Sequence, residues 1–218
     1  MDDLSKVKIG FFGTPLFALR VLKQLKINFA NIKYVVTQNP KPSGRGQKIN
    51  LSAVNKWSNL NGLKVFNPNN TKDPEFIKTI LAIEVDFIVV VAYGHLINEE
   101  ILNYPKYMSL NVHASLLPLW RGAAPIQRAI LNGDKETGVS IMRVDKKLDS
   151  GPVISKKNIE AIREILIKDN IGHIINQWCL PFYTTLLCRL CLVLANKKAK
   201  IYATLHNPTD DYPMTKAL

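Results

Sequence analysis

Apolar residues along the first half of the chain fall into patterns that predict an α/β fold. Segments rich in apolar residues at 7–12 and 32–37 indicate strands, and the continuous apolar run at 86–92 indicates a strand that is covered on both faces. Between the first two runs, residues 17–25 carry apolar side chains at helical spacing. A strand, a helix and a second strand in this order are typical of a parallel sheet.

The same reading predicts the elements that follow. Asp73 is expected to cap a helix whose first residue is Pro74, a position where the missing N–H of proline has no cost. The predicted fold is therefore a doubly wound α/β domain with a mostly parallel sheet. The remaining predicted elements are helices at 53–61, 69–83, 123–131, 162–166 and 171–195 and strands at 65–66, 107–113, 137–144 and 153–155.

Composition narrows the class of protein. The 218 residues are 47% apolar and 21% charged, which is ordinary for a globular protein with one good core. The 29 basic and 17 acidic residues give a net charge of +12, which favours a polyanionic partner or a lysine-rich solvated surface. Three cysteines and an amino terminus without an apolar signal segment predict a reducing cytoplasm.

Two segments near the carboxyl end raise alternatives that the residues themselves disfavour. The apolar run 178–195 contains Pro181 and Arg189, which argue against a membrane span. Cys188 and Cys191 have a spacing seen in metal sites, but no second pair follows, and cysteines three apart on a helix usually pack. We therefore expect no metal and no membrane contact.

A group of polar residues in the middle of the chain is the best candidate for chemistry. Asn111 and His113 lie two apart on a predicted strand, so both side chains point to the same face. Asp149 would complete an acid–base group if the fold returns it to this strand. Each residue alone is equally compatible with a structural role, as a core histidine, a capping asparagine or a turn aspartate.

The longer string around these residues carries a resemblance. It contains Asn111-x-His113, SLLP at 115–118, WRGAAPIQ at 120–127 and LDSG at 148–151, and the chain opens with FFGTPLFA at 11–18. This string resembles the folate-dependent formyltransferases and, through WRGAAPIQ, the methionyl-tRNA formyltransferases among them. Two departures from the family pattern are Leu119, which replaces a basic residue, and Pro152, which replaces an acidic one in many members.

The resemblance implies a Rossmann-like catalytic domain at residues 1–206 and, at 207–218, the start of a hinge to a carboxyl-terminal tRNA-binding barrel absent from these 218 residues. It implies formyl transfer from 10-formyltetrahydrofolate to the α-amine of initiator methionyl-tRNA, by a cytoplasmic and monomeric enzyme. Asn111 and His113 would stabilise the oxyanion. Asp149 would orient His113, favour its charged form and help to move protons.

The resemblance also suggests binding residues. The folate contacts expected from it are Ser115, Leu116, Leu117, Pro118, Tyr93, Gly94 and Asp145. Residues 39–50, rich in glycine, proline and basic side chains, are expected to form a mobile surface loop that meets the tRNA acceptor stem through Lys41, Arg45 and Lys48. Two alternatives remain: a folate formyltransferase acting on a small amine, such as glycinamide ribonucleotide or an amino sugar, and a catalytically impaired remnant that binds tRNA or folate.

Overall fold

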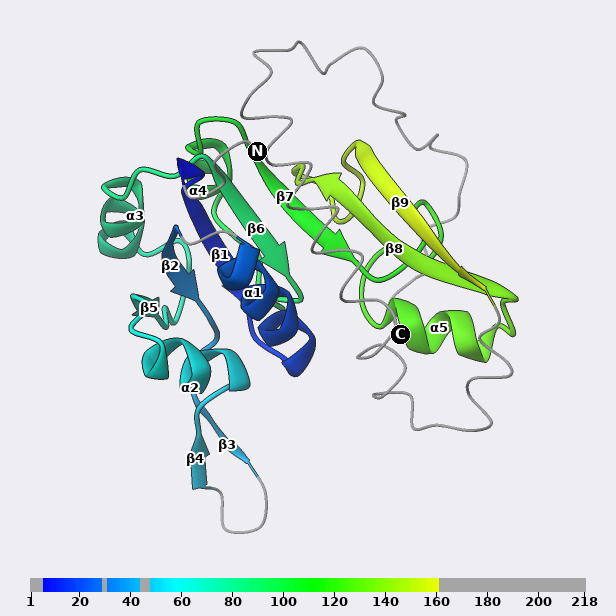
Figure 1. The fold of residues 1–218 in the computed structure, drawn as a ribbon, viewed down its shortest axis with the longest axis horizontal. Helices are drawn as coiled ribbons and strands as arrows, with labels where there is room; N and C mark the ends of the chain where they lie inside the picture. The colour runs from blue at the N-terminus through cyan, green and yellow to red at the C-terminus, as the bar shows by residue number, and fades with distance from the viewer. Residues whose placement is uncertain (1–5, 29–30, 44–47, 161–218) are drawn as a thin grey trace. The chain divides into compact units, whose positions relative to one another are not determined.

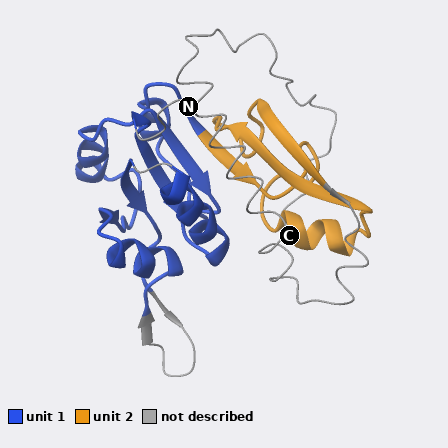
Figure 2. Cartoon of the chain, in the orientation of Figure 1, with its two compact units in different colours: residues 1–109, 188–197 blue, residues 110–187, 198–218 orange. Residues whose placement is uncertain are grey.

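The computed structural model describes residues 6–28, 31–43 and 48–160 and contains two compact units (Figures 1 and 2). Within the described residues, unit 1 ends at Ser109 and unit 2 begins at Leu110. The described elements are β1 (Ile9–Gly13), α1 (Leu16–Asn28), β2 (Ile32–Val36), β3 (Lys41–Ser43), β4 (Lys48–Asn50), α2 (Ala53–Leu60), β5 (Val65–Phe66), α3 (Pro74–Leu81), β6 (Phe87–Val91), α4 (Glu99–Asn103), β7 (Met108–His113), α5 (Pro125–Leu131), β8 (Glu136–Arg143) and β9 (Val153–Glu160).

Several predictions concern residues outside these ranges. The helices predicted at 162–166 and 171–195, the apolar run 178–195 and the hinge at 207–218 all lie there, as do Cys188 and Cys191. Among the described residues, no helix is long and apolar enough to cross a membrane.

The strands form a seven-stranded sheet in the order β5-β2-β1-β6-β7-β8-β9. In unit 1, β1 pairs with β2 on one side and with β6 on the other, and β2 pairs with β5, all in parallel. The chain thus moves outward from β1 to β2 and β5 and then returns to the opposite side of β1. In open α/β sheets this reversal opens a crevice at the carboxyl ends of the two strands, where ligands bind.

Helices cover both faces of the unit 1 strands (Figure 1). On one face, Phe12 and Ile88 from the strands form a buried cluster with Phe76 and Ile80 of α3 and Ile101 of α4. On the other face, α1 packs against β1 and β6. Continuous apolar strands are expected where a parallel sheet is covered twice. The predicted doubly wound α/β fold with a mostly parallel sheet is confirmed.

The helix boundaries differ from the prediction in two places. Asp73 caps α3 by accepting a hydrogen bond from the Glu75 N–H, and Pro74 is the first helical residue, as predicted. The helix is however shorter than the predicted range 69–83. The five-residue α4 was not predicted at all, because it is too short for a helical period and is marked mainly by its cap, Asn98.

The segment 39–50 was predicted as a loop, and that prediction is wrong for Lys41–Ser43 and Lys48–Asn50, which form strands. Here β3 and β4 pair in antiparallel fashion, with Lys41 opposite Asn50 and Ser43 opposite Lys48. Antiparallel strands need only a short connection, so a segment rich in turn residues can close on itself as a hairpin. The hairpin forms its own two-stranded sheet.

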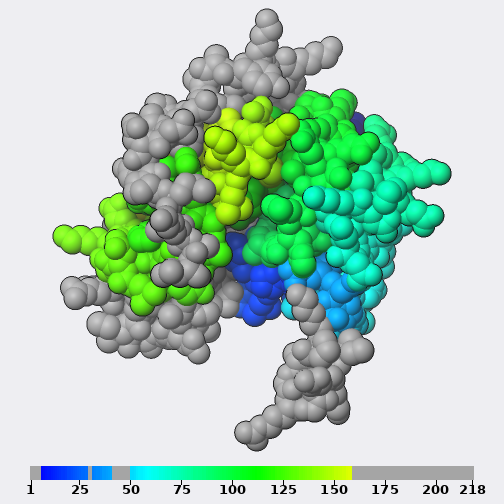
Figure 3. Space-filling view, turned by 180° about the vertical axis from the view of Figure 1, so that it is seen from behind, coloured from blue at the N-terminus to red at the C-terminus, as the bar shows by residue number. Residues whose placement is uncertain are grey.

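The strands of unit 2 run antiparallel to one another. His113 of β7 lies opposite Ser140 of β8, and β8 pairs with β9 from Glu136 to Met142. β9 extends to Glu160, five residues beyond the predicted end at 155, and its side chains reach the surface shown in yellow in Figure 3. A bulge between Ile141 and Met142 interrupts the pairing near the loop that leads to Asp149.

Candidate active site

The structure brings Asn111, His113 and Asp149 together at the end of β7. The Asn111 Nδ2 amide donates to Asp149 Oδ1 at 3.1 Å. The His113 Nδ1 atom lies 3.5 Å from Asp149 Oδ2, with only 8% and 10% of the two side chains exposed. The Gly122 N–H donates to the same Oδ2 at 2.9 Å. The Asp149 carboxylate therefore faces three nitrogen atoms in a site largely shielded from water.

Asp149 reaches this position because the β8–β9 connection folds back sharply. The Arg143 N–H donates to the Pro152 carbonyl at 3.0 Å and closes the base of the connection. A Cβ atom at position 151 would overlap the Arg143 carbonyl oxygen, so only glycine permits this closure. Asp149 itself has a φ of 45°, a left-handed conformation that costs a non-glycine residue free energy. Strain of this kind is typical of functional sites.

Both ring nitrogens of His113 face polar atoms. Nε2 lies 2.9 Å from the Trp120 carbonyl oxygen. Since a carbonyl can only accept, Nε2 carries a hydrogen. Nδ1 faces Asp149 at 3.5 Å, which is longer than a good N–H···O hydrogen bond. Nδ1 is thus the ring nitrogen left available to exchange a proton with a bound molecule.

The segment that follows His113 is held by a network of side chains. Ser140 Oγ donates to the Ser115 carbonyl at 2.7 Å and accepts the Leu117 N–H at 3.0 Å. Lys156 Nζ donates to the Leu117 carbonyl at 2.8 Å. Ser115 and Leu117 are fully buried, whereas Leu116 and Pro118 are partly exposed. The peptide bond between Leu117 and Pro118 is cis.

Comparison with known proteins identifies the family. The profile described as formyl transferase matches residues 6–175 of this chain, which is most of its length and includes the whole Asn111, His113 and Asp149 group.

The chain belongs to the formyl transferase family.

Two relatives that resemble this chain in sequence carry the same name. The chain is 47% identical over 152 residues to the methionyl-tRNA formyltransferase of Methylococcus capsulatus, an alignment that covers 70% of this chain and 49% of the relative. It is 45% identical over 154 residues to the methionyl-tRNA formyltransferase of Fusobacterium nucleatum, covering 71% and 49%. This formyl transferase chain therefore spans about half the length of the curated relatives it matches.

Solved structures agree on the fold. The phosphoribosylglycinamide formyltransferase of Bacillus halodurans superimposes with a TM-score of 0.67 at 21% identity, covering 90% of this chain and 99% of that one. A sugar N-formyltransferase from a Shewanella species gives a TM-score of 0.61 at 14% identity, covering 94% and 74%. At such identities the likeness shows the shared formyl transferase fold and nothing about the substrate.

In unit 1 of the formyl transferase chain, Tyr93 and Gly94 follow β6. Tyr93 is 3% exposed and packs edge-on against Phe12, with ring centroids 5.3 Å apart. Burial raises the pKa of the Tyr93 hydroxyl to about 12. The backbone carbonyl of Tyr93 accepts hydrogen bonds from Thr14 Oγ1 and Gln38 Nε2. A Cβ atom at Gly94 would lie 2.6 Å from the Gln38 amide nitrogen, so glycine allows the two loops to approach.

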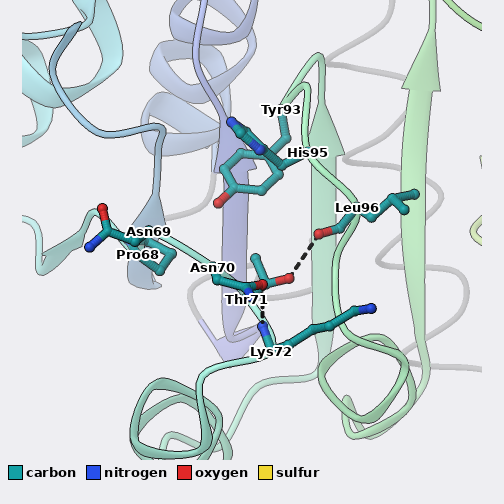
Figure 4. Close-up of a pocket in the computed structure, with 8 residues that line it drawn as sticks. All are labelled: Pro68, Asn69, Asn70, Thr71, Lys72, Tyr93, His95 and Leu96. Carbon is teal, nitrogen blue, oxygen red and sulfur yellow. Dashed lines mark hydrogen bonds between the residues drawn. The ribbon is translucent and has the colours of Figure 1, made fainter.

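A polar pocket of about 280 Å³ lies beside Tyr93, between the segments that follow β5 and β6 (Figure 4). The Tyr93 hydroxyl points into it, and His95 and Lys72 stand at its sides. Thr71 ties the two segments together, because its Oγ1 donates to the Leu96 carbonyl at 2.8 Å. Apart from the glycine after a strand, no residue pattern predicts this pocket.

The other predicted binding residues are dispersed. Asp145 is exposed on the β8–β9 connection, where its carboxylate accepts the Lys146 N–H. Lys41 is the first residue of β3 and Lys48 is the first residue of β4, so the two lysines lie on different strands of the hairpin. Arg45 lies outside the described residues. In the part of the chain that the structure describes, no three His, Cys, Asp or Glu side chains are grouped to hold a metal ion.

Two functional groups of the site escaped sequence reasoning. The Trp120 carbonyl and the Gly122 N–H contact His113 and Asp149 directly, yet both belong to the backbone. WRGAAPIQ carried the family resemblance, and the structure shows that its residues Trp120 and Gly122 also complete the polar site. A left-handed conformation at Trp120, with a φ of 56°, presents these backbone groups and has no sequence signal of its own.

Proposed function

We propose that this chain transfers the formyl group of 10-formyltetrahydrofolate to the α-amine of initiator methionyl-tRNA. The observation that carries the proposal is the 47% identity to a protein of that name over 152 residues. The chemistry of the site supports it, because formyl transfer to an amine needs a donor for the oxyanion and a group that carries a proton. Asn111 and His113 can supply these two functions beside Asp149.

The donor set fits a formyl carbonyl. One hydrogen of the Asn111 amide is used by Asp149, and the second is available to a carbonyl oxygen. 10-Formyltetrahydrofolate supplies the formyl carbon. Asn111 stabilises the negative charge that develops on the formyl oxygen as the amine attacks, and a donor in this role contributes about 3 kcal/mol.

His113 moves the proton. An α-amine has a pKa near 8, so a useful fraction is neutral and nucleophilic at about pH 7 to 8. With a hydrogen on Nε2, His113 takes the proton of the attacking amine at Nδ1 and returns it to the nitrogen that leaves. The C–N bond to the acceptor forms first, with the charge on the formyl oxygen, and the bond to the donor nitrogen then breaks. The proton lost by the amine is the one that the donor nitrogen gains, so the proton count balances. Asp149 contacts both the His113 ring and the Asn111 amide and so holds the two side chains in their positions.

Binding of the two substrates is part of the same proposal. In unit 1, Tyr93 and Gly94 contact folate, and Lys41, Arg45 and Lys48 contact the acceptor stem. In unit 2, residues 115–118 and Asp145 contact folate. We propose further that the enzyme acts as a monomer in the cytoplasm. The net charge of +12 supports a polyanionic substrate.

The test is formylation by this chain of charged initiator tRNA, with 10-formyltetrahydrofolate as donor and formyl-methionine measured by mass spectrometry. Glycinamide ribonucleotide and an amino sugar nucleotide serve as competing acceptors. We expect product on tRNA and none on the small amines, and we expect none from His113→Ala. The control Lys78→Ala changes an exposed residue of α3 that lines neither the catalytic group nor the pocket beside Tyr93, and it should keep activity. Product on a small amine alone would overturn the proposal.

A further inference from the structure

Trp120 connects His113 to an acidic side chain that lies outside the catalytic group. Its carbonyl oxygen meets His113 Nε2 at 2.9 Å, and its indole Nε1–H donates to Asp134 Oδ2 at 2.6 Å. The other oxygen of Asp134 accepts from the Asn132 Nδ2 amide at 2.6 Å. Asp134 is therefore linked to the His113 ring, which the proposed reaction uses, through a single residue, Trp120.

Asp134 is itself anchored by α5. Its N–H donates to the Ala129 carbonyl at 3.0 Å, just beyond the end of the helix. The Asn132 N–H donates to the Arg128 carbonyl at 2.9 Å, so both the carboxylate and its second partner are fixed by the last turn of α5. A helix end thus provides a rigid support for the indole of Trp120.

Trp120 needs such a support. Its φ of 56° is a conformation that a bulky side chain rarely adopts and that persists only where surrounding contacts hold it. The indole nitrogen can only donate, and a carboxylate is the stronger class of acceptor for it. Two residues further on, the Gly122 N–H meets Asp149 Oδ2, so the backbone of 120–122 contacts both His113 and Asp149. Movement of Trp120 would disturb both residues.

We propose that Asp134 is a positioning residue that acts through Trp120 to fix the tautomer of His113. The anchored Trp120 carbonyl holds the hydrogen on Nε2 and leaves Nδ1, which faces Asp149, as the proton acceptor. Without the anchor the carbonyl moves, and the ring exchanges between tautomers and orientations. This inference rests on the proposed function for its kinetic consequence, but the state of the ring can be observed without any substrate.

The direct test is ¹⁵N NMR of the histidine ring in the full chain, comparing wild type with Trp120→Phe and Asp134→Ala. In wild type we expect the His113 ring to carry its hydrogen on Nε2. Both variants should show a mixture of tautomers at the same pH. Asp134→Asn keeps an oxygen that can accept from the indole and should restore the wild-type spectrum. An unchanged His113 spectrum in folded Trp120→Phe would overturn the inference, whatever the substrate of the enzyme proves to be.

Kinetics provide the second readout. Trp120→Phe and Asp134→Ala should lower kcat by about ten- to a hundredfold, because a small misplacement of an acid–base group is costly, while KM for the formyl donor changes little. The control Glu136→Ala removes a nearby exposed acid that accepts a hydrogen bond from Asn158, and it should match wild type. If the variants lost activity only in proportion to their loss of thermal stability, and their His113 spectrum stayed that of wild type, the inference would also be overturned.

Discussion

The two units hold their functional positions by different means. In unit 1, every residue of β1 and four of the five residues of β6 are buried, and the loops that follow them start from this apolar platform. In unit 2, the site depends on directed polar contacts, with three nitrogen atoms around the Asp149 carboxylate and two polar atoms beside the His113 ring. Apolar packing tolerates small shifts, whereas a hydrogen bond weakens steeply with angle.

This difference leads to an expectation about substitutions. A polar change in unit 2 should reduce the rate of the chemical step more than it reduces the free energy of unfolding. A change at a predicted binding residue of unit 1 should affect substrate binding and leave the chemical step intact. Three substitutions test this contrast, in order of decreasing effect.

Asp149→Asn should have the largest effect. Its side chain keeps the size of aspartate but presents only one acceptor oxygen, so the Asn111 amide and the Gly122 N–H cannot both retain their partners. We expect kcat for formylation to fall by about a thousandfold, as for the loss of an oriented acid–base pair together with an oxyanion donor. The measurement is single-turnover formylation of methionyl-tRNA.

Ser150→Ala is the matched control for that substitution. It removes a neighbouring hydroxyl that donates to the Lys147 carbonyl, and it should keep the wild-type kcat. If Asp149→Asn retained more than about a tenth of the wild-type rate, the polar group in unit 2 would not be the centre of the reaction, since acid–base catalysis alone contributes more than that.

Arg45→Ala should have an intermediate effect that appears in binding. Arginine can contact phosphate and base together, so its loss should weaken use of methionyl-tRNA by about ten- to a hundredfold and flatten the dependence on salt. The folate KM should hardly change. The measurement is kcat/KM for tRNA across rising salt, with Lys78→Ala, an exposed basic residue of α3, as the control. Equal salt slopes for Arg45→Ala and wild type would show that the 39–50 segment does not bind tRNA.

Tyr93→Phe should have the smallest effect at neutral pH, because it removes only a hydroxyl. Its consequence is expected at high pH. The pKa of this hydroxyl is about 12 in the folded chain and about 10 in an unfolded one. The unfolded state therefore loses its proton first, so the stability from burying neutral Tyr93 is complete below pH 10 and is lost as pH rises toward 12.

The measurement for Tyr93→Phe is the unfolding midpoint Tm between pH 9 and 11. Wild type should lose more of its Tm over this range than Tyr93→Phe, while both remain alike near pH 8. We expect Tyr93→Phe to raise the KM for the formyl donor by no more than about threefold, since the substitution removes one hydroxyl at the edge of the proposed binding site. An identical fall of Tm in the two proteins would show that Tyr93 ionises as readily in the folded chain as in the unfolded one.

The sequence predicted the strands better than the short elements between them. Residues 86–92 form a long apolar run, and β6 lies inside that range, because burial on both faces demands such a run. The paired strands β3 and β4 and the five-residue α4 were missed, since three to five residues are too few to show a strand or helix periodicity in the sequence. Local turn and cap chemistry specifies these elements, and many turn-rich segments share it.

The site was predictable to the extent that side chains alone define it. Strand alternation places Asn111 and His113 on one face, and the family resemblance added Asp149. The contacts of Trp120 and Gly122 come from backbone atoms, which every residue possesses, so no residue type marks them. Asp134 follows Asn132-Gly133 and has the sequence signature of an ordinary helix stop, although its carboxylate binds the Trp120 indole.

The central place of β1 also bears on how the protein is made. β1 leaves the ribosome before both of its partners, and one of them, β6, is synthesised only after β2, β5 and three helices, with Ile9 finally paired to Phe87. At typical translation rates of about 5–20 residues per second, the nascent β1 waits several seconds with an apolar edge unpaired. Such an edge is a template for pairing with other chains. A chaperone that shields the nascent chain over this interval would raise the yield of folded protein.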